Sequence, residues 1–246
     1  MNTTNSKVAI VTGASRGIGA QVAKRLAQEG FAIVVNYSSS AAEAETLVSA
    51  IETHGGRAIA IKADVASSQD VRRLFDETEQ QFGGVDVLVN NAGIMSLATI
   101  AETDDATVDR QININFKGSF NTMREAAIRM RDGGRVINFS SSVVAMLQPT
   151  YGVYAGTKAA VEAMTSVFAK ELRGRSITVN AVAPGPTATD LFLNGKPQEA
   201  VERLSKLAPL ERLGQPEDIA ATVAFLAGPD GAWINGQTLR ANGGII

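Results

Sequence analysis

The sequence predicts a doubly wound α/β fold, in which helices cover both faces of a parallel seven-stranded sheet. Short apolar runs alternate along the chain with helical patterns, as crossover connections between parallel strands require. A glycine-rich turn joins the first apolar run to the first helical pattern. The 246 residues, 45% of them hydrophobic, suffice for one large core and contain no convincing linker. Residues 1–246 are therefore expected to form a single domain.

The composition argues against several classes of function. Acidic and basic residues are mixed throughout, with a net charge of −2, so nucleic acid finds no basic stripe and a membrane finds no polybasic patch. With no cysteine and one histidine, disulfides are impossible and a zinc or iron site is nearly excluded, so redox chemistry would need an organic cofactor. No apolar run approaches the ~20 residues that span a bilayer. A cytoplasmic protein without a metal site is expected.

The first predicted strand, Val8 to Val11, leads through a glycine-rich turn into a helix that ends at Gly30. Backbone N–H groups at the start of such a helix point toward a phosphate, and glycines let the phosphate approach. The spacing is G-x-x-x-G-x-G, which differs from the dinucleotide fingerprint G-x-G-x-x-G, and three glycines in a turn are weak evidence alone. The candidate cofactor-binding residues of this turn are Gly13, Ser15, Arg16, Gly17, Ile18 and Gly19.

The second predicted strand, which ends at Asn36, bears on the choice of cofactor. Sites that prefer NAD carry an acidic side chain near here to accept from the ribose 2′-hydroxyl, whereas this chain has Asn36, Tyr37 and Ser38. Asn36 and Ser38 would not repel a 2′-phosphate, and Arg16 offers a planar cation for it. These residues favour NADP(H). The alternative is that Arg16 is a solvated turn residue.

The alternation of helices and strands continues to the end of the chain. The expected helices are 41–53, 68–82, about 106–130, 154–172 and 216–227, and the expected strands are 58–62, 85–89, 136–139, 177–182 and 237–240. Ligands of parallel sheets bind at the carboxyl ends of the strands. Polar residues follow three of these strands, at Asp64, Asn90-Asn91 and Ser140-Ser141-Ser142. The coincidence predicts one site.

The segment after the strand 177–182 is long and irregular. It opens at Pro184-Gly185-Pro186-Thr187 and contains a second group of helix breakers at Asn194-Gly195-Lys196-Pro197. Such a loop is either a lid over the site or flexible surface. We expect a substrate lid at about residues 187–206.

Tyr154 and Lys158 lie four positions apart in a predicted helix, so that the phenol and the ammonium share one face. A fixed cation favours the phenolate and would bring the pKa of Tyr154 closer to neutral, where a general acid or base works. Ser141, at the end of the strand 136–139, adds a neutral donor for a substrate oxygen. The alternative interpretation is a packed ring beside a solvated cation.

Three other residues are less decisive. Asn115 lies inside a predicted helix, where asparagine is unfavourable, so its side chain either faces solvent or is present for a hydrogen bond. His54 stands beside a helix stop and is given a capping or solvated role rather than a catalytic one. Trp233, the only tryptophan, is expected to pack as a large apolar body.

Taken together, these motifs resemble the short-chain dehydrogenase/reductase family, in the branch whose members are single domains of this length. No motif is specific alone, but their order and spacing match over essentially the whole chain. The matching segments are Thr12-Gly13…Gly17-Ile18-Gly19, Asp64-Val65, Asn90-Asn91-Ala92-Gly93, Asn115, Ser141, Tyr154…Lys158, Pro184-Gly185 and Leu213 to Asp218. The resemblance implies a Rossmann-type sheet with strand order 3-2-1-4-5-6-7.

The resemblance also implies catalytic roles. Tyr154 would donate a proton to a carbonyl oxygen while the nicotinamide gives hydride, and Lys158 would hold the nicotinamide ribose and lower the pKa of Tyr154. Ser141 would orient the carbonyl, and Asn115 would anchor a water molecule in a proton relay. Ser142 is the alternative to Ser141, because loss of one residue from the loop before Tyr154 would shift the interval between them.

Further cofactor contacts follow from the same resemblance. Asp64 and Val65 would lie at the adenine, and Asn91, Ala92 and Gly93 along the cofactor. Pro184 to Thr189, including Gly185 and Thr187, would surround the nicotinamide. The last helix pair and the C-terminal strand commonly build a homotetramer in this family, so one is expected here.

The function expected from the sequence is NADPH-dependent reduction of the carbonyl of a ketone or ketoester, reversible as alcohol oxidation. The small-molecule substrate would enter between the loop Met95 to Ala98 and the lid.

Two alternatives remain open. A 3-oxoacyl-[acyl-carrier-protein] reductase would need a basic surface beside the cleft for its acidic partner, and Arg129, Arg131 and Lys170 are the candidates. A non-enzymatic NADP-binding redox sensor or scaffold would be expected to lose Tyr154 or Lys158, and both are present.

Overall fold

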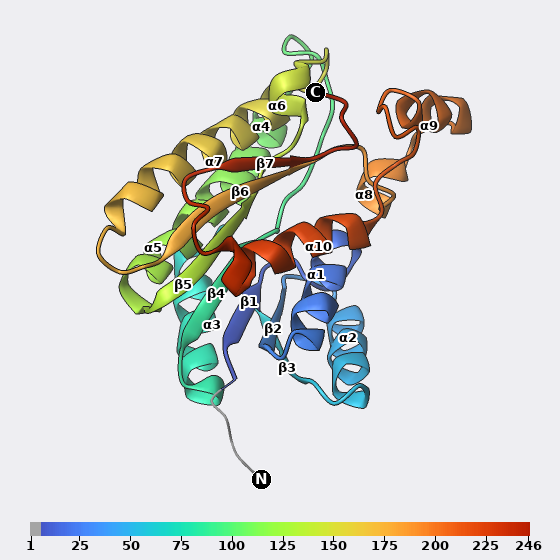
Figure 1. The fold of residues 1–246 in the computed structure, drawn as a ribbon. Coiled ribbons are helices and arrows are strands. Elements are labelled where there is room, and N and C mark those ends of the chain that lie inside the picture. The colour runs from blue at the N-terminus through green and yellow to red at the C-terminus, as the bar shows by residue number, and fades with distance from the viewer. Residues whose placement is uncertain (1–5) are drawn as a thin grey trace.

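The computed structural model describes residues 6–246 as a three-layer α/β fold (Figure 1). Its seven strands are all parallel and lie in the order β3-β2-β1-β4-β5-β6-β7, which confirms the predicted order. The strands are β1 (Val8–Val11), β2 (Ala32–Tyr37), β3 (Arg57–Lys62), β4 (Val85–Asn90), β5 (Met130–Phe139), β6 (Thr178–Pro184) and β7 (Thr238–Ala241). Within residues 6–246, no helix has the length and apolar character needed to cross a membrane.

Helices cover both faces of the sheet because alternate residues of each strand point to opposite sides. Ala9 and Val11 of β1 join a core that includes α1 (Gly17–Gln28), α2 (Ala41–Thr53) and α10 (Pro216–Ala227). Val8 and Ile10 join the opposite core, under α3 (Ser68–Phe82), α5 (Gly118–Arg129) and α7 (Gly152–Glu171). Figure 1 shows these two helical layers on either side of the sheet.

The remaining helices are short. They are α4 (Asp105–Gln111), the π-helical turn η1 (Ile112–Lys117), α6 (Val143–Met146), α8 (Asp190–Leu193), α9 (Gln198–Ser205) and the 3-10 turn η2 (Pro229–Gly231). Several helix starts follow from the sequence: the Ser67 and Asp104 side chains cap α3 and α4, and Pro216 begins α10.

Three details differ from the sequence expectations. The helix predicted over 106–130 is interrupted by η1, and β5 begins at Met130, so that Gly133-Gly134 lies inside that strand segment rather than closing the helix. The irregular segment after β6 contains α8 and α9. Trp233, expected to pack, is 98% exposed, because it lies between η2 and β7 at the outer strand of the sheet.

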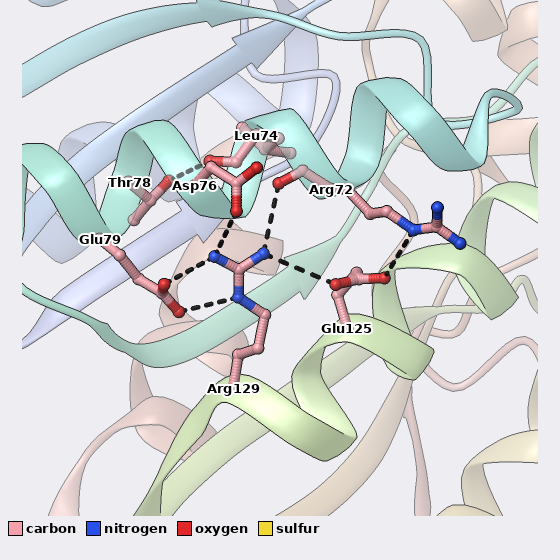
Figure 2. A network of polar contacts seen from close by, with 7 residues as sticks. All are labelled: Arg72, Leu74, Asp76, Thr78, Glu79, Glu125 and Arg129. Carbon is pink, nitrogen blue, oxygen red and sulfur yellow. Dashed lines mark hydrogen bonds and ion pairs between the residues drawn. The ribbon is translucent and has the colours of Figure 1, made fainter.

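Charged side chains join α3 to α5 at the amino end of β5. The Arg129 guanidinium donates to both carboxylate oxygens of Glu79, at 2.9 and 2.6 Å, and to Asp76 at 2.7 Å, and it lies 3.6 Å from Glu125 (Figure 2). These carboxylates raise the pKa of Arg129 above its ordinary value. Arg131 is paired with Asp86 at 2.9 Å.

A chain of buried side-chain hydrogen bonds holds α5 and α7 against the sheet. Thr122 of α5 donates to the Asn90 amide oxygen at 2.7 Å, and the Asn90 amide donates to Asn138 at 2.8 Å. The Asn138 amide then donates to Thr165 of α7, also at 2.8 Å. Because each of these groups is out of water, an unpaired one would cost about 1–3 kcal/mol. This series of hydrogen bonds therefore favours one position of α7 on the sheet.

Candidate active site

Of the polar groups predicted to share a site, Asn91 and Ser140 to Ser142 line one pocket at the carboxyl ends of the central strands, whereas Asp64 and Asn90 do not line it. A pocket of about 900 Å³, including its open mouth, lies there between the glycine-rich turn, the loop after β5, α7 and the lid. The predicted residues that line it are Ile18, Asn91, Gly93, Ser141, Tyr154, Lys158, Pro184, Gly185, Thr187 and Thr189.

Tyr154, Ser141 and Lys158 form the centre of this pocket. The Ser141 hydroxyl is close enough to the Tyr154 phenol to lower the pKa of the phenol, and the Lys158 Nζ lies 5.8 Å from the centre of the Tyr154 ring. Nζ donates to the backbone carbonyl oxygen of Phe139, the last residue of β5, at 2.8 Å. Lys158 is only 4% exposed. The alternative of a packed ring beside a solvated cation therefore does not describe this lysine.

Burial dominates the titration of both groups. It raises the pKa of Tyr154 to about 12, against a lowering by the Ser141 hydroxyl, and it lowers the pKa of Lys158 to about 8. The sequence predicted instead that Lys158 would lower the pKa of Tyr154. The direction differs because the cost of removing the phenolate from water is larger than the stabilisation that the Lys158 ammonium can give it. That ammonium is 5.8 Å from the centre of the ring, and burial disfavours its charged form.

The structure distinguishes the two serines that the sequence left open. Ser142 is buried, and its hydroxyl donates to the Ala183 carbonyl oxygen at 3.2 Å and accepts from the Asn242 amide at 3.1 Å. Ser141 is the serine that lowers the pKa of Tyr154. Ser142 therefore ties the loop after β5 to β6 and the C-terminal segment, whereas the role of Ser141 in orienting a substrate oxygen stays a prediction.

Asn115 is buried in the π-helical turn η1. Its amide oxygen accepts from the Ile94 N–H at 2.8 Å, and its amide nitrogen donates to the Ile94 carbonyl at 2.9 Å and to the Thr157 hydroxyl at 3.2 Å. The residue is thus present for hydrogen bonds, not facing solvent, and it joins the loop after β4 to α7. Its role in a proton relay stays a prediction.

Close packing explains the glycines of the first turn. A Cβ on Gly13 would lie 2.9 Å from the Ala92 Cα, and one on Gly19 would lie 2.5 Å from the Asn91 amide nitrogen. That amide donates to the carbonyl oxygens of Thr12 and Gly13, both at 3.0 Å. Two of the segments predicted to bind cofactor are therefore packed directly against each other.

Asn36 differs from its expected placement at the cofactor ribose. It is 1% exposed; its amide oxygen accepts from the Gly13 N–H at 3.3 Å and its amide nitrogen donates to the Ala63 carbonyl at 3.0 Å. The Asn36 side chain is therefore occupied by hydrogen bonds to the backbone of the glycine-rich turn and of the segment after β3. Arg16 and Ser38 are exposed and Tyr37 is partly exposed, so these three side chains remain accessible.

Asp64 and Val65, expected at the adenine, differ in accessibility. The exposed Asp64 carboxylate accepts from the Ala66 N–H at 2.9 Å. Val65 is 6% exposed and packs on the start of α5, where a Cβ on Gly118 would lie 2.6 Å from its side chain. Its side chain belongs to the core.

The three basic residues considered for a carrier-protein surface do not flank the pocket. Arg129 and Arg131 lie at the amino end of β5, opposite the end that carries Ser141, and both are paired with carboxylates. Lys170 is twelve residues beyond Lys158 on α7, roughly 18 Å along the helix axis. These residues therefore cannot form the basic surface beside the pocket that a carrier-protein reductase would need.

The sequence motifs missed half of the outer wall of the pocket. This wall is formed by Met95, Val143, Met146, Gln148, Tyr151, Leu191, Phe192 and Leu204. Except for the Met95 loop and the lid, which were expected to border the substrate, nothing in the sequence indicated them, because they lie on short helices and loops with no motif spacing. Their positions depend on how these segments pack.

Comparisons with known proteins agree with this architecture. Residues 13–246 match the family described as enoyl-(acyl carrier protein) reductase. The chain is 50% identical to a short-chain type dehydrogenase/reductase of Picea abies, over 98% of this chain and 92% of that protein. It is 44% identical to an NADPH-dependent aldehyde reductase-like chloroplastic protein of Arabidopsis thaliana, over 98% and 94%. A Burkholderia cenocepacia short-chain dehydrogenase solved with NADP superposes with a TM-score of 0.92 at 37% identity, over 98% of both chains.

We predict that Lys158→Met stabilises the protein at neutral pH. Below a pH of about 8 the native state holds a charged ammonium out of water, a penalty that the unfolded chain does not have. The penalty fades as the pH rises from about 8 toward 10.5, since the unfolded chain then binds more protons than the native one. The free energy of unfolding in urea should therefore rise by roughly 1–3 kcal/mol at pH 7 and by less at pH 9.5.

Lys170→Met, on the exposed side of the same helix, is the matched control and should leave stability nearly unchanged. A Lys158→Met protein that is less stable than the wild type at pH 7 would show that the hydrogen bond to Phe139 outweighs the burial of charge.

Proposed function

The chain belongs to the short-chain dehydrogenase/reductase family, and on this premise we propose that it reduces the carbonyl group of a ketone, ketoester or aldehyde with hydride from NADPH, reversibly. The observation that carries the proposal is that Ser141, Tyr154 and the buried Lys158 line one pocket, which has room for a small molecule.

The cofactor is NADP(H), which relatives that are NADPH-dependent or were solved with NADP support. When bound, it supplies the hydride. The start of α1 fits its phosphates, because Gly13 and Gly17 have positive φ and the backbone at Gly19 packs tightly on Asn91. Arg16, at the N-terminal end of α1, is the cation proposed for the 2′-phosphate.

The side chains in the pocket supply the proton and the orientation. With a pKa of about 12, Tyr154 holds its proton at neutral pH, and it is the group proposed to donate that proton to a carbonyl oxygen. Ser141 is proposed to donate a second hydrogen bond to the same oxygen. Lys158 is proposed to bind the nicotinamide ribose and, when charged, to stabilise the phenolate that remains. Asn115 is proposed to bind the relay water that restores the proton.

A carrier-protein reductase is a weaker candidate because Arg129, Arg131 and Lys170 lie away from the pocket mouth. A cytoplasmic location stays a prediction from the sequence.

We predict that Tyr154→Phe lowers kcat for carbonyl reduction by at least about 100-fold, because general acid catalysis contributes a factor of this size. The measurement is the initial rate of NADPH oxidation with a panel of ketones, ketoesters, aldehydes and a β-ketoacyl thioester. NADPH binding by fluorescence should stay intact in the variant, which separates loss of chemistry from loss of fold. Full turnover by Tyr154→Phe would refute the mechanism, and a wild type that binds NADPH but reduces no carbonyl would favour a redox sensor.

We predict that Arg16→Ala raises the Kd for NADPH much more than the Kd for NADH, because only NADPH carries the 2′-phosphate. Arg173→Ala is the matched control, since Arg173 is exposed beyond the end of α7. Equal losses for both cofactors would place Arg16 outside the phosphate site.

We propose that the protein is a homotetramer assembled partly through α10 and the C-terminal strand. Trp233, 98% exposed, and Phe225, 41% exposed, offer apolar surface there. Light scattering should give about four times the 25.8 kDa chain mass, and Trp233→Glu should shift the distribution to smaller species. A monomeric wild type would contradict the assembly.

A further inference from the structure

The wall of the pocket opposite the cofactor-binding residues consists almost entirely of apolar side chains. Met95 follows β4, and Val143 and Met146 belong to α6, while Leu191, Phe192 and Leu204 come from the lid helices α8 and α9. The polar groups on this side are the Gln148 amide and the Tyr151 hydroxyl. A substrate group that enters this part of the pocket exchanges water for hydrocarbon.

The charge of the pocket is as informative as its apolar wall. Among the described residues, 6–246, Lys158 is the only one with a charged side chain that lines the pocket. That ammonium is buried and already donates to the Phe139 carbonyl oxygen. No arginine of the same range lines the pocket. A carboxylate or phosphate on the substrate would therefore lose its hydration without gaining an ionic partner, which is strongly unfavourable.

Lys196 supports the aromatic part of the lid. Its Nζ lies 4.5 Å from the centre of the Phe192 ring and donates to the Phe192 carbonyl oxygen at 2.5 Å. The cation–π contact and the hydrogen bond restrict the ring, which lines the pocket without bringing the Lys196 charge into its lining. Phe192 is thus held as a flat apolar surface for a planar or branched group.

We infer that the substrate is an uncharged carbonyl compound with an aromatic or bulky aliphatic group next to the carbonyl, packed between Met146 and Phe192. This inference rests on the proposed carbonyl reduction and names the substrate class of the same pocket. Methionine side chains adapt their shape, so the pocket accepts a range of such groups. It rejects keto acids and sugar phosphates by desolvation rather than by size.

The test compares two aromatic aldehydes that share a ring and differ in charge: methyl 4-formylbenzoate and 4-formylbenzoate. With wild-type enzyme and saturating NADPH, kcat/KM for the neutral ester should exceed that for the carboxylate by at least about ten-fold, mostly through KM. Equal or better use of the carboxylate would overturn the inference while leaving carbonyl reduction intact. Absence of turnover with every carbonyl of the wider panel would instead overturn the proposed function, and the inference with it.

A charge added to the wall sharpens the test. Met146→Lys should narrow or reverse the preference for the ester, because it supplies the missing cation, and Gln148→Lys does the same from a neighbouring position if the first variant does not fold. Thr46→Lys, on the exposed side of α2, adds the same charge far from the pocket and should keep the wild-type ratio. If both folded pocket variants keep the wild-type ratio, the proposed wall does not contact the substrate.

Discussion

The docking of α7 on the carboxyl half of β5 is the interaction on which the site depends. Hydrogen bonds fix it, among them those from the Asn138 amide to the Thr165 hydroxyl and from the Lys158 ammonium to the Phe139 carbonyl oxygen. Because Ser141 follows β5 directly, this docking brings it to Tyr154 on the first turns of α7. The Thr122–Asn90–Asn138 bonds extend the same connection to β4 and α5. Buried amides pair in few ways, so the helix has little freedom to slide.

The centre of the site is held in an electrostatically unfavourable state. Lys158 is buried with a lowered pKa and Tyr154 with a raised one, and both shifts have the same cause, removal of a charged form from water. The fold tolerates the lysine because its stem is surrounded by protein and its head has a carbonyl partner. Such a buried ammonium lowers the stability of the native state at neutral pH, which fits a functional rather than a structural reason for its presence.

The two sides of the pocket are built on different principles. On the side proposed for the cofactor, glycines without room for a Cβ, and the Asn36 and Asn91 amides bonded to the backbone, lock the turn after β1 to the ends of the neighbouring strands. On the side proposed for the substrate, α8, α9 and the segment after β5 contribute mainly side chains that adapt, among them Met146 and Leu204. Rigid backbone suits an invariable phosphate, whereas an adaptable wall suits variable organic groups.

The sequence by itself determined the sheet, its strand order through family resemblance, and the group of Ser141, Tyr154 and Lys158, because strand and helix periodicity and i,i+4 spacing are local properties. Only the tertiary structure decided that Asn36 is hydrogen-bonded to the backbone and that Val65 is buried in the core. It likewise decided that Ser142 is hydrogen-bonded to β6 and that Arg129 lies at the amino end of β5. It also decided the direction of the Tyr154 pKa shift, which burial sets, and the apolar outer wall of the pocket. These depend on burial and on contacts between segments far apart in the chain, which no local pattern encodes.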